Sequence, residues 1–139
     1  MADTVNSSEP ASAGLQLLKL WYLLGALMLL SVAAVSLMPV PPSVGAGDKL
    51  SHAVTYFVLG GWFALLARGR RVLLWSGIGL LVFGMLLELL QGLTGYRYSE
   101  WGDVLANGGG ILAGALLYFT PLTRVLAFID RKLARFLLR

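Results

Sequence analysis

Four apolar stretches constrain the fold of this chain more than any other feature of its sequence. A transmembrane helix needs about 20 predominantly apolar residues, and each stretch is close to that length. The stretches cover residues 20–38, 50–67, 72–93 and 104–120. Helices in the core of a soluble protein would carry a polar stripe at the helical period, and these stretches have almost none. The sequence therefore predicts an all-α polytopic membrane protein, built as a bundle of four transmembrane helices.

The composition argues against a soluble domain. Of the 139 residues, 58% are hydrophobic and 13% are charged, which is about half the charged share of an ordinary soluble protein. The net charge of +4 fits lysines and arginines placed against a membrane surface, so we expect no nucleic-acid partner. Cysteine is absent, which excludes disulfides and thiolate metal sites.

Basic residues gather on one side of the four predicted spans. With four crossings, only Lys49 and Arg97 fall on the side opposite the chain ends. The basic residues on the side of the chain ends are Lys19, Arg68, Arg70, Arg71, Arg124, Arg131, Lys132, Arg135 and Arg139. Because cytoplasmic loops carry the excess of Lys and Arg, both termini and the loop after the second span are predicted to face the cytoplasm.

The two ends of the chain differ from the predicted membrane domain at residues 17–121. Residues 1–16 are rich in small and polar side chains and are predicted to form a disordered cytoplasmic leader. In the tail at 122–139, apolar residues recur at helical spacing among basic ones. This pattern predicts a basic amphipathic helix on the inner leaflet, and an extension of the fourth span into the cytoplasm is the alternative.

Polar side chains form a pair on each of the last three spans, at the outward end of the helix. The pairs are Asp48 with His52, Glu88 with Gln91, and Asp103 with Asn107. Spacings of three and four place both members of a pair on one helix face. Ionisable groups at membrane depth are costly and normally face the bundle interior, where they mark function. We therefore predict one polar pocket open to the outside, against the alternative of a network that only holds the helices together.

The same residues resemble the motifs of a known family. The segment Asp48-Lys49-Leu50-Ser51-His52 resembles the motif that opens the second helix of VanZ-like membrane proteins. The residues Glu88, Gln91, Arg97, Asp103, Asn107, Gly110 and Gly114 resemble that family's second motif, in order and spacing. The match runs from about residue 48 to 118, over half the chain. It implies a bacterial cytoplasmic membrane protein of the cell envelope, in a family named after a protein associated with resistance to the glycopeptide antibiotic teicoplanin. It does not supply a reaction.

Three functions remain open at this stage. In the first, Lys49 and Arg97 hold an anionic envelope lipid or lipid-linked precursor in a ligand site completed by Asp48, Gln91 and Asn107. In the second, a transferase or hydrolase acts on such a precursor, with His52, Glu88 and Asp103 as catalytic groups. In the third, the chain is a scaffold or accessory subunit that binds a membrane protein partner or forms a homo-oligomer.

No metal site or other cofactor is predicted from the residues. Asp48, His52, Glu88 and Asp103 could hold a divalent cation. However, one histidine with dispersed acids is a weak metal signature.

Overall fold

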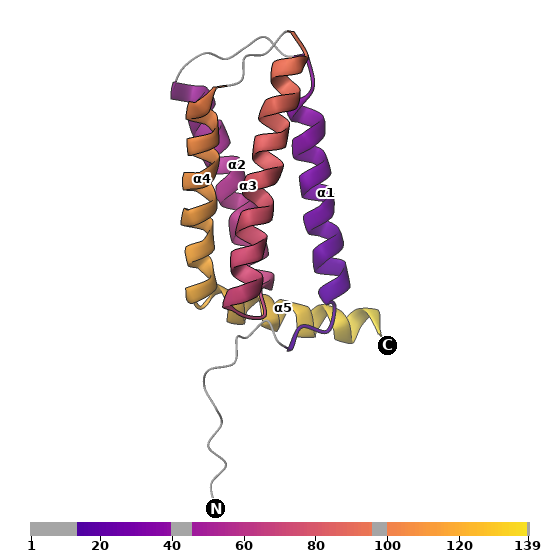
Figure 1. Ribbon diagram of the computed structural model, residues 1–139. Coiled ribbons are helices and arrows are strands. Elements are labelled where there is room, and N and C mark those ends of the chain that lie inside the picture. Colours follow the sequence, from indigo (N-terminus) through magenta and orange to yellow (C-terminus); the bar gives the residue numbers. More distant parts are fainter. Residues whose placement is uncertain (1–13, 40–45, 96–99, 139) are drawn as a thin grey trace, which may run out of the picture.

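The computed structural model describes residues 14–39, 46–95 and 100–138. Within this part of the chain every regular element is a helix, as the sequence predicts (Figure 1). The elements are α1 (Leu18–Ser36), α2 (Ala46–Leu66), α3 (Arg70–Leu93), α4 (Trp101–Ala115), the 3₁₀ turn η2 (Leu116–Phe119) and α5 (Leu122–Leu137). Residues 1–13 of the predicted leader at 1–16 lie outside the described residues.

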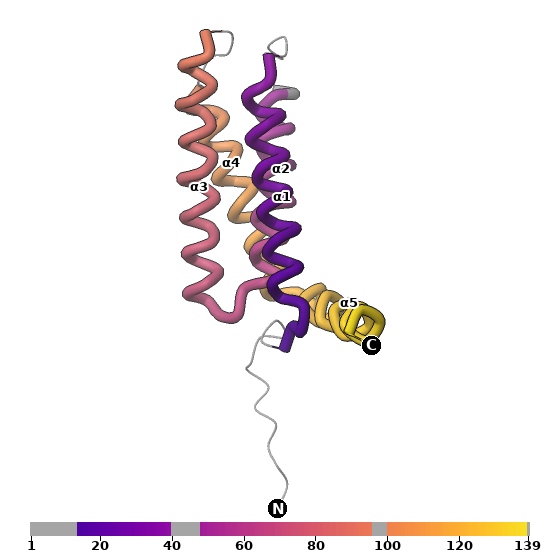
Figure 2. The backbone as a smooth tube through the Cα atoms, turned by 90° about the vertical axis from the view of Figure 1, so that its right-hand side faces the viewer, coloured from indigo at the N-terminus to yellow at the C-terminus, as the bar shows by residue number. Residues whose placement is uncertain are grey.

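Helices α1 to α4 run alternately up and down in one bundle, and α5 lies across one end of it (Figures 1 and 2). We call that end the α5 end, and the end at which α2 and α4 begin the site end. The direction of the chain changes between η2 and α5, where Thr120 is extended and Pro121 precedes the new helix. Consequently α5 does not continue the line of α4.

In the described part of the chain, three helical segments are long and apolar enough to cross a membrane: α1, α3, and α4 together with η2. Four such segments were predicted, and α2 is the one that does not qualify. Its length of 21 residues is sufficient, but the helix begins four residues earlier than the apolar stretch at 50–67. Its first two turns therefore include Asp48, Lys49 and His52, and these polar residues lower its hydropathy.

Large apolar side chains cover the outer surface of α1 and α3. Leu27 and Leu30 of α1 are at least half exposed, as are Leu74 and Leu86 of α3. In water, this exposed apolar area would be strongly unfavourable. In a bilayer the same side chains face lipid tails, so the surface of the bundle suits the membrane that the sequence predicts.

Helices α2 and α4 make the most extensive contact in the described part of the chain. The contact depends on Gly110 and Gly114 of α4, which face the backbone of α2. A Cβ atom at Gly110 would lie 2.9 Å from the backbone nitrogen of Phe57 and would collide with the carbonyl oxygen of Ala53. Small residues at such positions let two membrane helices approach closely.

At the α5 end, the buried Asp130 joins α5 to the start of α1. Its carboxylate accepts hydrogen bonds from the backbone nitrogens of Gln16 (2.6 Å) and Leu17 (3.0 Å) and from Nε1 of Trp21 (2.7 Å). An acid beside a helix N-terminus also interacts favourably with the helix dipole. Asp130 thus fixes the position of α5 against the bundle.

We expect Gly110→Ala to destabilise the protein, because the added methyl group must push α4 away from the backbone of α2. Overpacking of this kind costs about 1–3 kcal/mol. Gly109→Ala is the matched control, since a Cβ atom there would meet nothing within 4 Å. Thermal unfolding in detergent, followed by circular dichroism, measures the effect. Equal unfolding temperatures for the two variants would contradict this account of the α2–α4 contact.

We also expect Asp130→Asn to loosen α5, because an amide NH₂ group cannot accept the hydrogen bonds that the carboxylate accepts. A lost buried hydrogen-bond partner costs about 1–3 kcal/mol. Hydrogen exchange monitored by mass spectrometry should show faster exchange in residues 14–21 and in α5. The exposed Arg124→Gln in the same helix serves as the control, and unchanged exchange in Asp130→Asn would contradict the role of the carboxylate.

The same contact should depend on pH. Burial alone would raise the pKa of Asp130, but the hydrogen bonds from Gln16, Trp21 and Leu17 and the charge of Arg131 outweigh it, so the pKa lies below its usual range. A carboxyl with a lowered pKa stabilises the fold above the unfolded pKa of about 3.9. This stabilisation is lost as the pH falls toward the folded pKa, and Asp130→Asn should lack that part of the acid response.

Candidate functional site

The alternating direction of the helices brings three polar pairs to the site end. Asp48 and His52 lie in the first two turns of α2, and Asp103 and Asn107 lie in the first two turns of α4. Glu88 and Gln91 lie in the last two turns of α3, which runs in the opposite direction. The structure therefore places six of the predicted site residues in one region of the bundle. Lys49 accompanies them, and Arg97 lies outside the described residues.

The side chains from α3 and α4 are buried. Glu88, Gln91, Asp103 and Asn107 are each at most 4% exposed. Burying a polar group is unfavourable unless it is hydrogen-bonded, and burying a charge is more so. Burial of these four side chains therefore lowers the stability of the bundle. Such costly buried polar groups are typical of functional positions in membrane proteins.

His52 lies between the side chains of Asn107 and Glu88. Its Nδ1 is 3.1 Å from Oδ1 of Asn107 and 3.6 Å from Oε1 of Glu88. An amide oxygen can only accept a hydrogen bond, so this contact places the ring proton on Nδ1. The lone pair of Nε2 is then available to a proton, a ligand or a cation.

Lys49 is engaged by two acids. Its Nζ is 2.7 Å from Oε2 of Glu100 and 3.7 Å from Oδ1 of Asp103. Its hydrogen bond holds the pKa of the Glu100 carboxyl below the usual range. The described residues of the site end thus include four carboxylates (Asp48, Glu88, Glu100 and Asp103) and one lysine, so acidic groups outnumber basic ones there.

Gln91 connects the site to α1. Its Nε2 donates a hydrogen bond of 2.9 Å to the backbone oxygen of Ser36, the last residue of α1. Because the final carbonyls of a helix lack intrahelical partners, this bond satisfies one of them and holds the end of α1 against α3.

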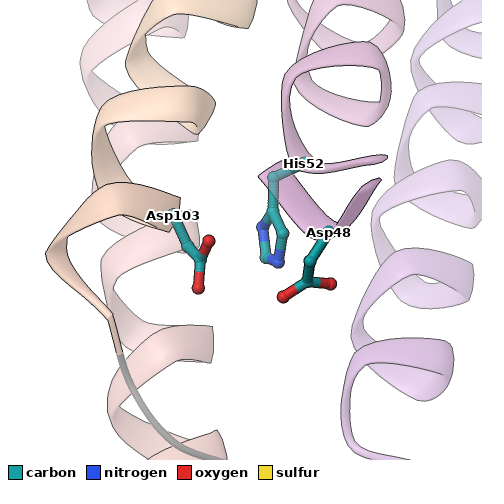
Figure 3. Close-up of side chains that lie close together, drawn as sticks. All are labelled: Asp48, His52 and Asp103. Atoms are coloured by element: carbon teal, nitrogen blue, oxygen red, sulfur yellow. The ribbon is translucent and has the colours of Figure 1, made fainter. Parts of the chain in front are cut away.

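The side chains of Asp48, His52 and Asp103 lie close together, as Figure 3 shows. Each offers one oxygen or nitrogen atom, and these atoms all lie within 4.8 Å of one another. Asp48 and His52 come from α2, whereas Asp103 reaches toward them from α4 (Figure 3).

A cavity of about 410 Å³ lies beside these residues, between α1, α2 and α3. Its polar lining includes Asp48, Ser51, His52 and Gln91. A second hollow, of about 610 Å³, continues along α1 and α2 and is lined mainly by apolar residues such as Leu27, Met28, Val58 and Leu59. Ser31, Val32 and Thr55 line both, so the polar cavity opens directly into an apolar groove.

Several lining residues escaped the sequence interpretation. Ser51, Thr55 and Tyr56 of α2 face the cavity together with Asp48 and His52. Spacings of three and four along one helix carried this signal. Hydroxyl groups are common in transmembrane helices, however, so their presence alone does not indicate a site.

No protein-family model, no curated protein and no solved structure matches the chain. The resemblance to VanZ-like proteins therefore rests on the motifs.

Proposed function

We propose that this chain is a VanZ-like integral membrane protein that binds one amphipathic lipid of the cell envelope, or a lipid-linked envelope precursor. The headgroup would occupy the polar cavity at the site end, and an acyl or prenyl chain would lie in the groove between α1 and α2. The observation that carries the proposal is the continuity of the two spaces through Ser31, Val32 and Thr55. A polar space that opens into an apolar one matches the chemistry of a lipid.

The position of α2 supports a fourth crossing. It is antiparallel to α1 and α3 within the bundle (Figure 2), and its 21 residues are long enough to span. Its polar first turns face the site rather than lipid. With four crossings, the basic residues of the α5 end lie in the cytoplasm, the site faces outward, and α5 rests on the inner leaflet. We place the chain in a bacterial cytoplasmic membrane because of the family resemblance.

The chemistry of the cavity favours a headgroup rich in hydrogen-bonding groups. Ser51, Thr55 and Gln91 offer hydroxyl and amide groups, and Asp48 and His52 add an acceptor and a titratable ring. Lys49 lies at the edge of the site, with 43% of its side chain exposed. It remains able to contact a phosphate if Glu100 releases it. A site of this kind could link the protein to glycopeptide susceptibility through the envelope precursor that it binds.

A catalytic function is the second candidate, and the environment of His52 favours it. The ring lines the cavity, its Nδ1 is held by Asn107, and Glu88 lies 3.6 Å away. An imidazole oriented in this way is a suitable general base toward a substrate hydroxyl or water. Transfer or hydrolysis at a lipid-linked phosphate would then use the same cavity.

We expect Val32→Trp to block lipid binding, because the indole ring would fill the junction between the cavity and the groove. Leu30→Trp is the matched control, since Leu30 is 65% exposed on the outer surface of α1. Lipids that copurify in mild detergent are identified by native mass spectrometry. The amount bound should fall about tenfold for Val32→Trp, equivalent to about 1.4 kcal/mol. Equal lipid retention in both variants would contradict binding in this space.

We expect cysteines at positions 38 and 68 to label from opposite sides of the membrane. The chain has no cysteine of its own, so Met38→Cys and Arg68→Cys each give one thiol. An impermeant maleimide should label position 38 in intact cells and position 68 only after permeabilisation. Labelling of both positions from outside would mean that α2 does not cross.

A further inference from the structure

We propose that Asp48, His52 and Asp103 bind one divalent transition-metal cation, of the zinc or manganese class, at the wall of the polar cavity. The cation would provide the positive charge that holds the phosphate of the bound headgroup. The metal site stands on its own geometry, and only its role toward the headgroup rests on the proposed function.

The spacing of the three side chains suits a cation. Their ligand atoms lie within 4.8 Å of one another. Oxygen and nitrogen ligands bound at about 2.0–2.2 Å from a metal lie roughly 3–4 Å apart. The three side chains would have to move closer by about an ångström to coordinate one ion. The ligands come from α2 and α4, whose backbones lie in close contact at Gly110 and Gly114.

Asp103 provides an independent indication that something positive belongs here. Its side chain points toward His52 and Asp48 (Figure 3), and the residue is 3% exposed. Its Oδ1 accepts no hydrogen bond from any described residue. It forms an ion pair with Nζ of Lys49 at 3.7 Å, but that amine donates its hydrogen bond to Oε2 of Glu100 at 2.7 Å. A buried carboxylate oxygen in this state is costly, and a bound cation would satisfy it.

The orientation of His52 is that of a metal ligand. Ligating histidines donate their other ring N–H to an oxygen acceptor, which fixes the tautomer and the ring orientation. Here Nδ1 is bonded to Oδ1 of Asn107 at 3.1 Å, and Nε2 is left for the metal. The helix dipole favours acids in the first turns of α2 and α4, but it explains neither the histidine nor its orientation.

The set of donor atoms indicates the class of cation. One imidazole nitrogen with two carboxylates suits Zn²⁺ or Mn²⁺, whereas Ca²⁺ takes six to eight oxygen ligands. Three protein ligands leave at least one position open, which a phosphate oxygen can fill. A cation with two positive charges would also reduce the repulsion between an anionic headgroup and the carboxylates of Asp48 and Asp103.

The first experiment measures metal uptake by the full-length protein, purified in detergent without a polyhistidine tag and stripped with a chelator. After equilibrium dialysis against Zn²⁺, elemental mass spectrometry should find one Zn²⁺ per chain. Asp48→Asn, His52→Gln and Asp103→Asn should each weaken binding by about tenfold or more. Ser51→Ala is the control, because it alters the same cavity outside the donor set. Uptake equal to that of wild type in all three ligand variants would overturn the proposal.

A second measurement needs no variant and so does not depend on whether the variants fold. The chain contains one histidine, so any imidazole nitrogen coupled to a bound metal belongs to His52. Pulsed electron paramagnetic resonance of the wild-type protein with Mn²⁺ should show this nitrogen coupling. Bound Mn²⁺ without it would overturn the proposed ligand set.

Lipid retention separates the metal site from the proposed function. Native mass spectrometry of wild type with and without chelator should show several-fold less bound lipid after the metal is removed. If Zn²⁺ binds as expected but no lipid is retained, the metal site stands and the lipid function fails. If Val32→Trp loses lipid but wild type takes up no Zn²⁺, the lipid function stands and the metal site fails.

Discussion

The close approach of α4 to the backbone of α2 is the contact on which the rest of the structure depends. Gly110 and Gly114 permit it, because any larger residue would collide with the backbone of Ala53, Phe57 or Gly61. This approach holds the first turns of α2 and α4 together and so brings Asp103 and Asn107 to Asp48 and His52. Without this contact, each of these polar groups would face lipid on its own. Insertion scales give about 2.5–3.5 kcal/mol for one charged side chain at the centre of a transmembrane helix. Apolar packing thus makes the polar site possible.

Much of this arrangement could be predicted from the sequence, because three simple rules determine it: apolar length, helical spacing and the alternating direction of successive helices. Apolar length locates the helices, and α1 and α3 lie close to their predicted ranges. Spacings of three and four place Glu88 with Gln91 and Asp103 with Asn107 on single faces. Alternation of direction then brings these faces to one end. These rules need only the rise and pitch of an α-helix.

Other features depend on how helices are placed relative to one another, which a single sequence does not specify. The first functional hypothesis gave Lys49 a part in binding an anion, yet its amine donates a hydrogen bond to Glu100, the residue before α4. In the sequence, Asp130 stands beside Arg131 and Lys132, a pattern typical of a solvated helix face. Only the contact of α5 with the start of α1 shows that Asp130 is buried. The pattern of α2 also misled in part. The helix starts at Ala46, four residues before the apolar stretch predicted at 50–67, although Asp48 and His52 were correctly expected at one end of this helix.

Helix α1 is held by hydrogen bonds at its two ends and packs less extensively against its neighbours than α2 and α4 pack against each other, which leaves space for a groove beside it. At the α5 end, Asp130 holds the residues at its start, and Nε1 of Trp62 donates a hydrogen bond of 3.2 Å to the backbone oxygen of Trp21. At the site end, Gln91 binds the carbonyl of Ser36. Over its whole length, α1 makes a smaller contact with α2 and with α3 than α2 makes with α4. A helix held in this way can form the wall of a lipid-sized space, while the α2–α4 pair keeps the polar groups in place.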